Sequence, residues 1–145
     1  MTVLSREAAR DELVEGLTVA LDGLTASVYG YQAPVEAGLT PCVRVFGAGT
    51  LRPIVPETGR RSHFRLVVQV WVLAYDREGG WTEADAEDRL DAIEQAIAAW
   101  LGDNQFNEVW TAIEYAAMST VTAAVTQAGE TYLVEDIPIE VYVYG

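Results

Sequence analysis

The sequence predicts a single α+β domain over residues 1–145, within the broad α/β class, with two helices packed on one β-sheet. Three observations support this fold class. Two segments carry apolar residues at the spacing of an amphipathic helix, one run between them is apolar on both faces, and two alternating runs close the chain. We therefore expect a mixed or mainly antiparallel sheet of about four to five strands that ends in a C-terminal β-hairpin.

The first helix is expected to begin after Ser5, whose hydroxyl suits an N-cap, and to stop near Gly23. Gly16 within this segment lowers helix stability by about 1 kcal/mol relative to alanine, so only packing would hold the helix firmly. The apolar stripe consists of Leu13, Leu17, Ala20, Leu21 and Leu24.

The middle of the chain predicts an extended stretch, a loop, a strand and a long connection. "TASVYGYQ" is extended, and Pro34, Gly38 and Pro41 indicate a loop before a short strand at "CVRVF". Residues 47–62, "GAGTLRPIVPETGRRS", contain three glycines and two prolines and are interpreted as one long loop. Loops beyond about 12 to 15 residues are usually functional or disordered, so we expect this one to become ordered when a partner contributes contacts.

The next two elements carry the strongest signals. Residues 64–75 are apolar on both faces at "LVVQVWVL", which predicts a central strand covered on both sides. Thr82 and Asp85 have the spacing of a capping box, and Gly102 is expected to end the helix that they begin. The apolar stripe of this helix consists of Leu90, Ile93, Ile97, Trp100 and Leu101, and its first half carries Glu83, Glu87, Asp88, Asp91 and Glu94.

Two alternating runs, residues 113–125 and 133–143, place apolar residues at odd positions and threonines or charges at even ones. The tight turn "QAGE" lies between them. We expect an antiparallel hairpin with one face on the core and one more polar face.

The composition excludes several classes of protein. Nine basic residues, all arginines, stand against 22 acidic ones, so a net charge of −13 should repel the phosphate backbone of DNA. The single cysteine cannot form an intramolecular disulfide, which fits a reducing cytoplasm. We expect neither a secretory signal nor a membrane span, because no apolar run reaches the length that either requires.

The inventory of catalytic residues is thin, and we expect no enzyme activity and no cofactor. His63 is the only histidine and is interpreted as a polar residue at a strand entrance, while Cys42 is interpreted as a small buried hydrophobe. "FGAGTLR" begins like a phosphate-binding loop, but it lacks the third glycine, the lysine and the following helix. Gly47 and Gly49 are therefore interpreted as turn residues.

Two charged groups remain as candidate sites. Asp85, Asp88 and Asp91 share one helical face, where they could hold a magnesium ion or meet arginines of a neighbouring subunit. Four of the nine basic residues lie within fourteen positions: Arg52, Arg60, Arg61 and Arg65. A basic segment and an acidic helix in one small chain suit head-to-tail self-association. The alternative is that these arginines are solvating charges on a flexible loop.

The order of the elements resembles that of bacteriophage tail terminator proteins over nearly the whole chain. The likeness rests on a leading helix, "SVYGYQAP", "TPCVRVF", a long loop, "RRSHFRLVVQVWVLAYD", the helix "EDRLDAIEQAIAAWL" and a terminal hairpin. The resemblance implies a small α/β domain in a homohexameric ring without catalysis. Such a ring caps the tail tube, stops its polymerisation and presents a surface for joining the head.

The resemblance also implies partners and a location. The partners would be further copies of the chain, the tail-tube protein and a head-completion or connector protein, with DNA passing through the lumen without specific binding. The protein would be assembled in the bacterial cytoplasm and reside in the virion tail. Of the positions that the resemblance carries over, only Arg60 and Arg61 in the loop would be functional. The others are Arg65, which enters the central strand, and Leu90, Ile93, Ile97 and Leu101 on the packing helix. Another head–tail connector or tail-assembly protein is the alternative, and a small metal-dependent enzyme is a more distant one.

Overall fold

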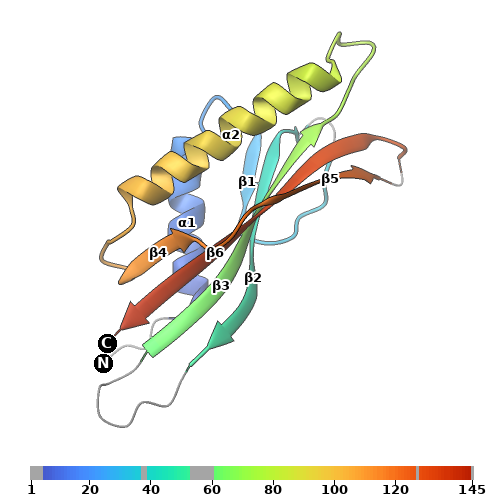
Figure 1. The fold of residues 1–145 in the computed structure, drawn as a ribbon. Coiled ribbons are helices and arrows are strands. Elements are labelled where there is room, and N and C mark those ends of the chain that lie inside the picture. The colour runs from blue at the N-terminus through green and yellow to red at the C-terminus, as the bar shows by residue number, and fades with distance from the viewer. Residues whose placement is uncertain (1–4, 37–38, 53–60, 127, 145) are drawn as a thin grey trace.

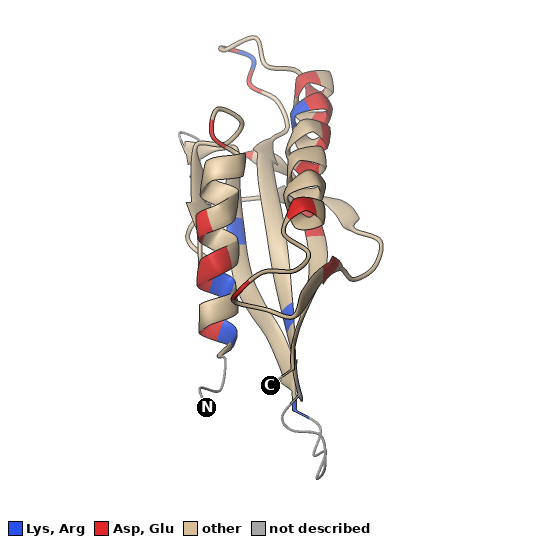
Figure 2. Ribbon diagram, turned by 90° about the vertical axis from the view of Figure 1, so that its left-hand side faces the viewer, with Lys and Arg blue, Asp and Glu red and all other residues tan. Residues whose placement is uncertain are grey.

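Both helices lie on the same face of one twisted sheet (Figures 1 and 2). The computed structural model describes residues 5–36, 39–52, 61–126 and 128–144. Its elements, in chain order, are α1 (Arg6–Ala20), β1 (Ser27–Tyr29), β2 (Cys42–Leu51), β3 (Arg61–Leu73), α2 (Glu83–Asp103), β4 (Ala112–Tyr115), β5 (Thr120–Val125) and β6 (Thr131–Tyr144).

The strand order is β1-β2-β3-β6-β4, and β5 also pairs with β6. The β1–β2 pair is parallel and the other pairs are antiparallel, so the sheet is mixed. This confirms the predicted fold class, including the hairpin, which β5 and β6 form. The sheet has six strands because β4 and β5 share one edge of β6.

The helix ends follow the sequence closely. The Ser5 hydroxyl accepts from the N–H of Ala8 at 3.1 Å. Thr82 and Asp85 form the predicted capping box, in which the Thr82 hydroxyl accepts from the Asp85 N–H and the Asp85 carboxylate accepts from the Thr82 N–H. Gly23 follows α1 with a φ of 85°. Gly102, expected to end α2, instead lies in its last turn, because Asn104 is the C-cap.

The core lies between the helices and one face of the sheet. The even-numbered residues of β3, from Phe64 to Val72, are buried on this face. Leu90, Ile93 and Ile97 of α2 are buried in the same cluster, which confirms the prediction that this stripe packs on the central strand. None of the helices in the described ranges is long and apolar enough to cross a membrane.

Among the described residues no helix lies on the other face of β3 (Figure 2), which corrects the expectation of cover on both sides. Val67, Gln69, Trp71 and Leu73 are only half-buried there. Part of this open face is covered by the β1–β2 connection, whose Ala33 is buried and accepts a hydrogen bond from Arg44. A run of apolar residues on both faces therefore did not require two helical layers.

Gly16 marks the place where α1 meets α2. A Cβ atom at this position would lie 2.0 Å from the ring of Trp100, so only glycine permits this approach. The Trp100 ring also meets that of Trp110 edge to face at 6.1 Å. Packing therefore accounts for a residue that is unfavourable in an isolated helix.

The predicted loop at 47–62 is shorter than expected. β2 continues to Leu51 and β3 begins at Arg61, while residues 53–60 lie outside the described ranges. Gly47 and Gly49 do not end the strand. They pair with Leu66 and Arg65, and the register of the β2–β3 pair shifts by one residue between them. Glycines that suggested a turn thus form a bulge.

The predicted run 113–125 is broken into β4 and β5, and Pro138 of β6 supplies the reason. Even-numbered residues of β6 direct their backbone groups toward this edge, as shown by the Pro138 carbonyl, which accepts from the Ala116 N–H at 2.9 Å. Proline has no N–H to offer the neighbouring strand. The edge strand leaves the ladder there and returns at Thr120, which pairs with Asp136.

Candidate functional site

The described arginines of the predicted cluster share one end of the sheet but lie on opposite faces. Arg52 donates to the Ser62 hydroxyl at 3.0 Å and lies over the ring of Phe64, both of which belong to the helix face. Arg65 lies on the open face, with 69% of its side chain exposed and its Nε 3.6 Å from a carboxylate oxygen of Glu140. Strand alternation separates them.

The side chains of the other two predicted arginines lie outside the described residues. Arg60 lies outside the described residues. Arg61 begins β3, where its backbone pairs with Tyr144, and its side chain also lies outside the description. The role in assembly that the resemblance implies for Arg60 and Arg61 therefore remains a prediction.

Arg6 also lies at this end of the molecule, although no pattern in the sequence predicted it. Its Nη1 donates to the Thr50 hydroxyl at 3.1 Å, and a Cβ on Gly47 would lie 2.7 Å from its Nε. Thr50 pairs with Phe64, whose ring lies under the guanidinium of Arg52. The basic end of the helix face thus combines residues from α1 and from the end of β2.

The acidic first half of α2 lies at the opposite end of the sheet from the start of β3 (Figures 1 and 2). Asp88 and Asp91 are exposed there. Asp85 is engaged by the cap, where hydrogen bonds from the backbone and the hydroxyl of Thr82 lower the pKa of its carboxyl. The described residues contain no group of three or more side chains placed to hold a metal ion.

Glu135 is a buried carboxylate that faces α2. Only 6% of the residue is exposed, and its Oε2 accepts from the Ser119 hydroxyl at 2.6 Å. Burial, and secondarily the charges of Glu94, Asp91 and Glu87, raise the pKa of Glu135. We did not single it out from sequence, although it occupies a core-facing position of an alternating run between Leu133 and Ile137.

Gln69 centres a polar network on the open face. Its side-chain oxygen accepts from the guanidinium of Arg44 at 3.0 Å and from the indole N–H of Trp71 at 2.7 Å. Its amide nitrogen donates to Asp136 at 2.8 Å, and Arg44 also donates to the carbonyl of Ala33. The network joins β2, β3 and β6 and fastens the β1–β2 connection to the sheet.

A second polar group surrounds Glu140 at the arginine end of the open face. Besides Arg65, the carboxylate has His63 Nε2 at 3.5 Å and the Tyr142 hydroxyl at 2.7 Å. The His63 ring stacks on that of Tyr142 at 4.5 Å. Hydrogen bonding to Glu140, followed by burial and the bond to Glu114, raises the pKa of Tyr142.

A groove of about 430 Å³ adjoins this group on the open face. Arg65 and Glu140 flank it, and Val67 and Pro138 form part of its apolar floor. Charged side chains beside an apolar floor are typical of a surface that receives another protein.

The arrangement of Cys42 and His63 does not form a nucleophile–base pair. Cys42 pairs with Trp71 and His63 with Leu51, which places them about 26 Å apart along β3 at 3.3 Å per residue. Burial raises the pKa of the Cys42 thiol to about 11, so the thiol stays protonated at neutral pH. Cys42 is buried, as predicted.

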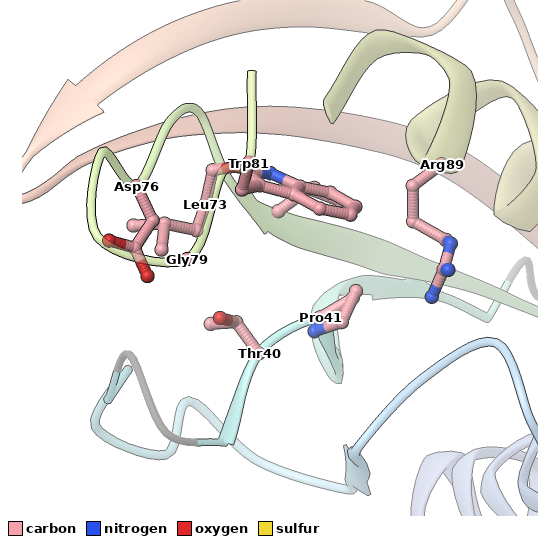
Figure 3. Close-up of a pocket in the computed structure, with 8 residues that line it drawn as sticks. Thr40, Pro41, Leu73, Asp76, Gly79, Trp81 and Arg89 are labelled. Atoms are coloured by element: carbon pink, nitrogen blue, oxygen red, sulfur yellow. Dashed lines mark hydrogen bonds between the residues drawn. The ribbon is translucent and has the colours of Figure 1, made fainter. Parts of the chain in front are cut away.

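A small cavity of about 250 Å³ lies where the β3–α2 connection meets the loop before β2 (Figure 3). The indole N–H of Trp81 donates to the Leu73 carbonyl at 2.7 Å, and Arg89 donates to the Leu24 carbonyl at 3.2 Å. The Arg89 guanidinium also lies over the Trp81 ring. These side chains fasten the start of α2 to the sheet and to the α1–β1 connection.

Because comparison with known proteins gives no match, a function can be inferred only from the geometry described above. No protein-family model matches the chain, and no curated protein matches it either.

Proposed function

We propose that the chain is a structural subunit of a phage tail that resembles a tail terminator. Copies associate head to tail into a ring, for which the resemblance implies six subunits. The ring caps the tail tube, stops its polymerisation and receives the head-joining protein, and this role requires no catalysis.

The observation that carries the proposal is the position of three arginines relative to the acidic helix α2. Arg6, Arg52 and Arg65 lie at one end of the sheet, and the exposed carboxylates of Asp88 and Asp91 lie at the other. A surface that meets a different surface of the next copy generates rings or filaments, and opposite charge selects the partner end. The net charge of −13 also suits a lumen through which DNA passes without adhering.

A charge exchange tests the contact between the two ends. Arg65→Glu and Asp88→Lys should each weaken association by about 2 to 5 kcal/mol, because each leaves one charge of an interface pair opposed by a like charge. Combining both changes in one chain should restore association. Molar mass from light scattering across protein concentrations measures each step, most sensitively at low salt.

Arg77→Glu is the control for charge reversal alone, because Arg77 is exposed in the β3–α2 connection, at the acidic end and away from the arginine end. It should not weaken association. Tail length, scored by electron microscopy in an assembly assay with tail-tube protein, tests the capping role separately. A wild-type chain that neither oligomerises at high concentration nor binds tube ends contradicts the proposal.

A further inference from the structure

β5 is an edge strand whose outer side is open. Among the described strands it pairs only with β6, in a ladder that ends where the Thr126 N–H donates to the Glu130 carbonyl. Because antiparallel bonds alternate, the backbone groups of Val121, Ala123 and Val125 point away from β6. No described residue bonds to them there.

The adjoining edge strand shows what a covered edge looks like. In β4 the outward N–H of Ile113 donates to the carbonyl of Gln105 at 2.9 Å, so the α2–β4 connection closes that part of the sheet. β5 has no such cover in the described part of the chain. On this side of the sheet the open backbone is therefore confined to β5.

The side chains around β5 do not protect this edge. Residues 115–129 carry no charge, although the chain as a whole carries −13. Val121 is 49% exposed, Val125 70% and Met118 90%. Soluble proteins usually guard an edge with charges, proline or a bulge, and an uncharged apolar edge without these devices pairs with another strand.

The segment is nearly self-complementary when it is reversed. In "TVTAAVT", residues 120–126, Val121 and Val125 are equidistant from Ala123, as are Thr120 and Thr126. Antiparallel pairing of two copies centred on Ala123 therefore sets valine against valine and threonine against threonine. Such β-branched cross-strand pairs favour a sheet, and the small alanine at the centre removes any clash.

Charge also selects a second copy at this edge. Two chains of −13 repel each other wherever acidic surfaces meet, and the longest uncharged stretch is the one that contains β5. α2, the most acidic element, packs on β3, β4 and β6. In an edge-to-edge pair the two α2 helices would stand roughly 15 Å or more apart at 4.8 Å per strand, which exceeds the screening length of about 8 Å.

We propose that β5 is a homodimerisation edge, which pairs antiparallel with β5 of a second copy about a two-fold axis at Ala123. The contact joins two sheets into one through about six backbone hydrogen bonds. It goes beyond the proposed ring and uses none of the charged residues of the head-to-tail contact.

Disulfide cross-linking tests the position of the axis. In this pairing the two Ala123 Cα atoms lie about 5.5 Å apart, within the range that a disulfide spans. Ala123→Cys should give a disulfide-linked dimer under mild oxidation, whereas Ala128→Cys, an exposed turn residue, should not. The native Cys42 is buried and present in every variant, so wild-type protein supplies the background.

A charge at the edge tests the pairing itself. In the Arg65→Glu background, where the ring contact is weakened, Ala123→Lys should convert the remaining dimer to monomer, while Ala128→Lys should leave the dimer intact. A dimer that survives Arg65→Glu combined with Ala123→Lys, or cross-linking that is equal at positions 123 and 128, overturns the proposal. If Ala123→Lys does not fold, the comparison of disulfide cross-linking in Ala123→Cys and Ala128→Cys tests the proposal by itself. Arg65→Glu should leave the Ala123→Cys cross-link intact, so failure of the ring and failure of this edge give different results.

Discussion

The two faces of the sheet come from the same strands, yet they differ in what covers them and in how they treat polar groups. The helix face buries side chains such as Phe64, Val68 and Ile137, with Ser62 and Glu135 as its buried polar residues. The open face carries the groups around Gln69 and Glu140, whose polar atoms largely bond to one another across strands. We conclude that the helix face supplies most of the stability, and that the polar side chains of the open face remain accessible to a partner protein.

The largest expected effect compares Ile93 with Val67. Ile93→Ala on the helix face should lower the free energy of unfolding by about 2 to 5 kcal/mol, because Ile93 is fully buried. Val67→Ala on the half-buried open face should lower it by about 1 kcal/mol or less. Urea unfolding followed by circular dichroism measures both, and equal losses would remove the distinction between the faces.

The helix layer itself can be tested with two glycines. Gly16→Ala should destabilise the fold by about 1 to 3 kcal/mol, because the new methyl group collides with Trp100. Gly102→Ala is the matched control in α2, where a Cβ meets no atom within 4 Å, and should stabilise by about 0.5 to 1 kcal/mol. Thermal unfolding measures both variants. If Gly16→Ala stabilised the protein as Gly102→Ala is expected to do, α1 would not contact Trp100 at Gly16.

The smallest effect concerns Glu135, the buried carboxylate on the helix face. Its pKa is raised in the folded state, so this state binds the proton more tightly than the unfolded chain. Stability from this group is therefore greatest below the ordinary pKa of 4.5 and falls as pH rises through the raised value. Glu135→Gln should stabilise the protein at pH 7 by up to about 1 kcal/mol.

The pH dependence supplies the control for Glu135. The gain from glutamine should vanish when unfolding is measured below pH 4.5, where the wild-type carboxyl is protonated in both states. A gain of equal size at both pH values would point to packing and not to ionisation.

Sequence reasoning succeeded where the signal was local. The capping box at Thr82, the stripe through Ile93 and the hairpin at the end of the chain depend on residues a few positions apart, and all three are present. Pro138 was a usable signal that we did not apply: a proline inside a strand run indicates an interruption beside it.

The sites were harder to predict because their residues meet through tertiary packing. Arg6 contacts Thr50, and Gln69 joins Arg44 to Asp136. These residues lie far apart in the sequence, so the periodicity of a helix or a strand cannot predict that they meet. Nearness in sequence was also misleading, because Arg52 and Arg65 were grouped together although the sheet stands between their side chains. Strand parity alone would not have separated them, because the bulge between Gly47 and Gly49 reverses the alternation of β2, so that its even-numbered residues lie on the open face before the bulge and on the helix face after it.

The place of β6 has a consequence for how the chain acquires its structure. β3 pairs with β6 along its whole length, as in the pair Val68 and Ile137, and β4 and β5 pair with the other side of β6. Until residues 131–144 have been synthesised, β3 has only β2 beside it and its remaining edge is unsatisfied. Closing such distant pairs is slow, because loop entropy is lost before contacts form. Between the synthesis of Leu73 and that of Thr131 the nascent chain therefore carries an incomplete sheet with an unpaired edge, and a shorter interval would leave less time for aggregation.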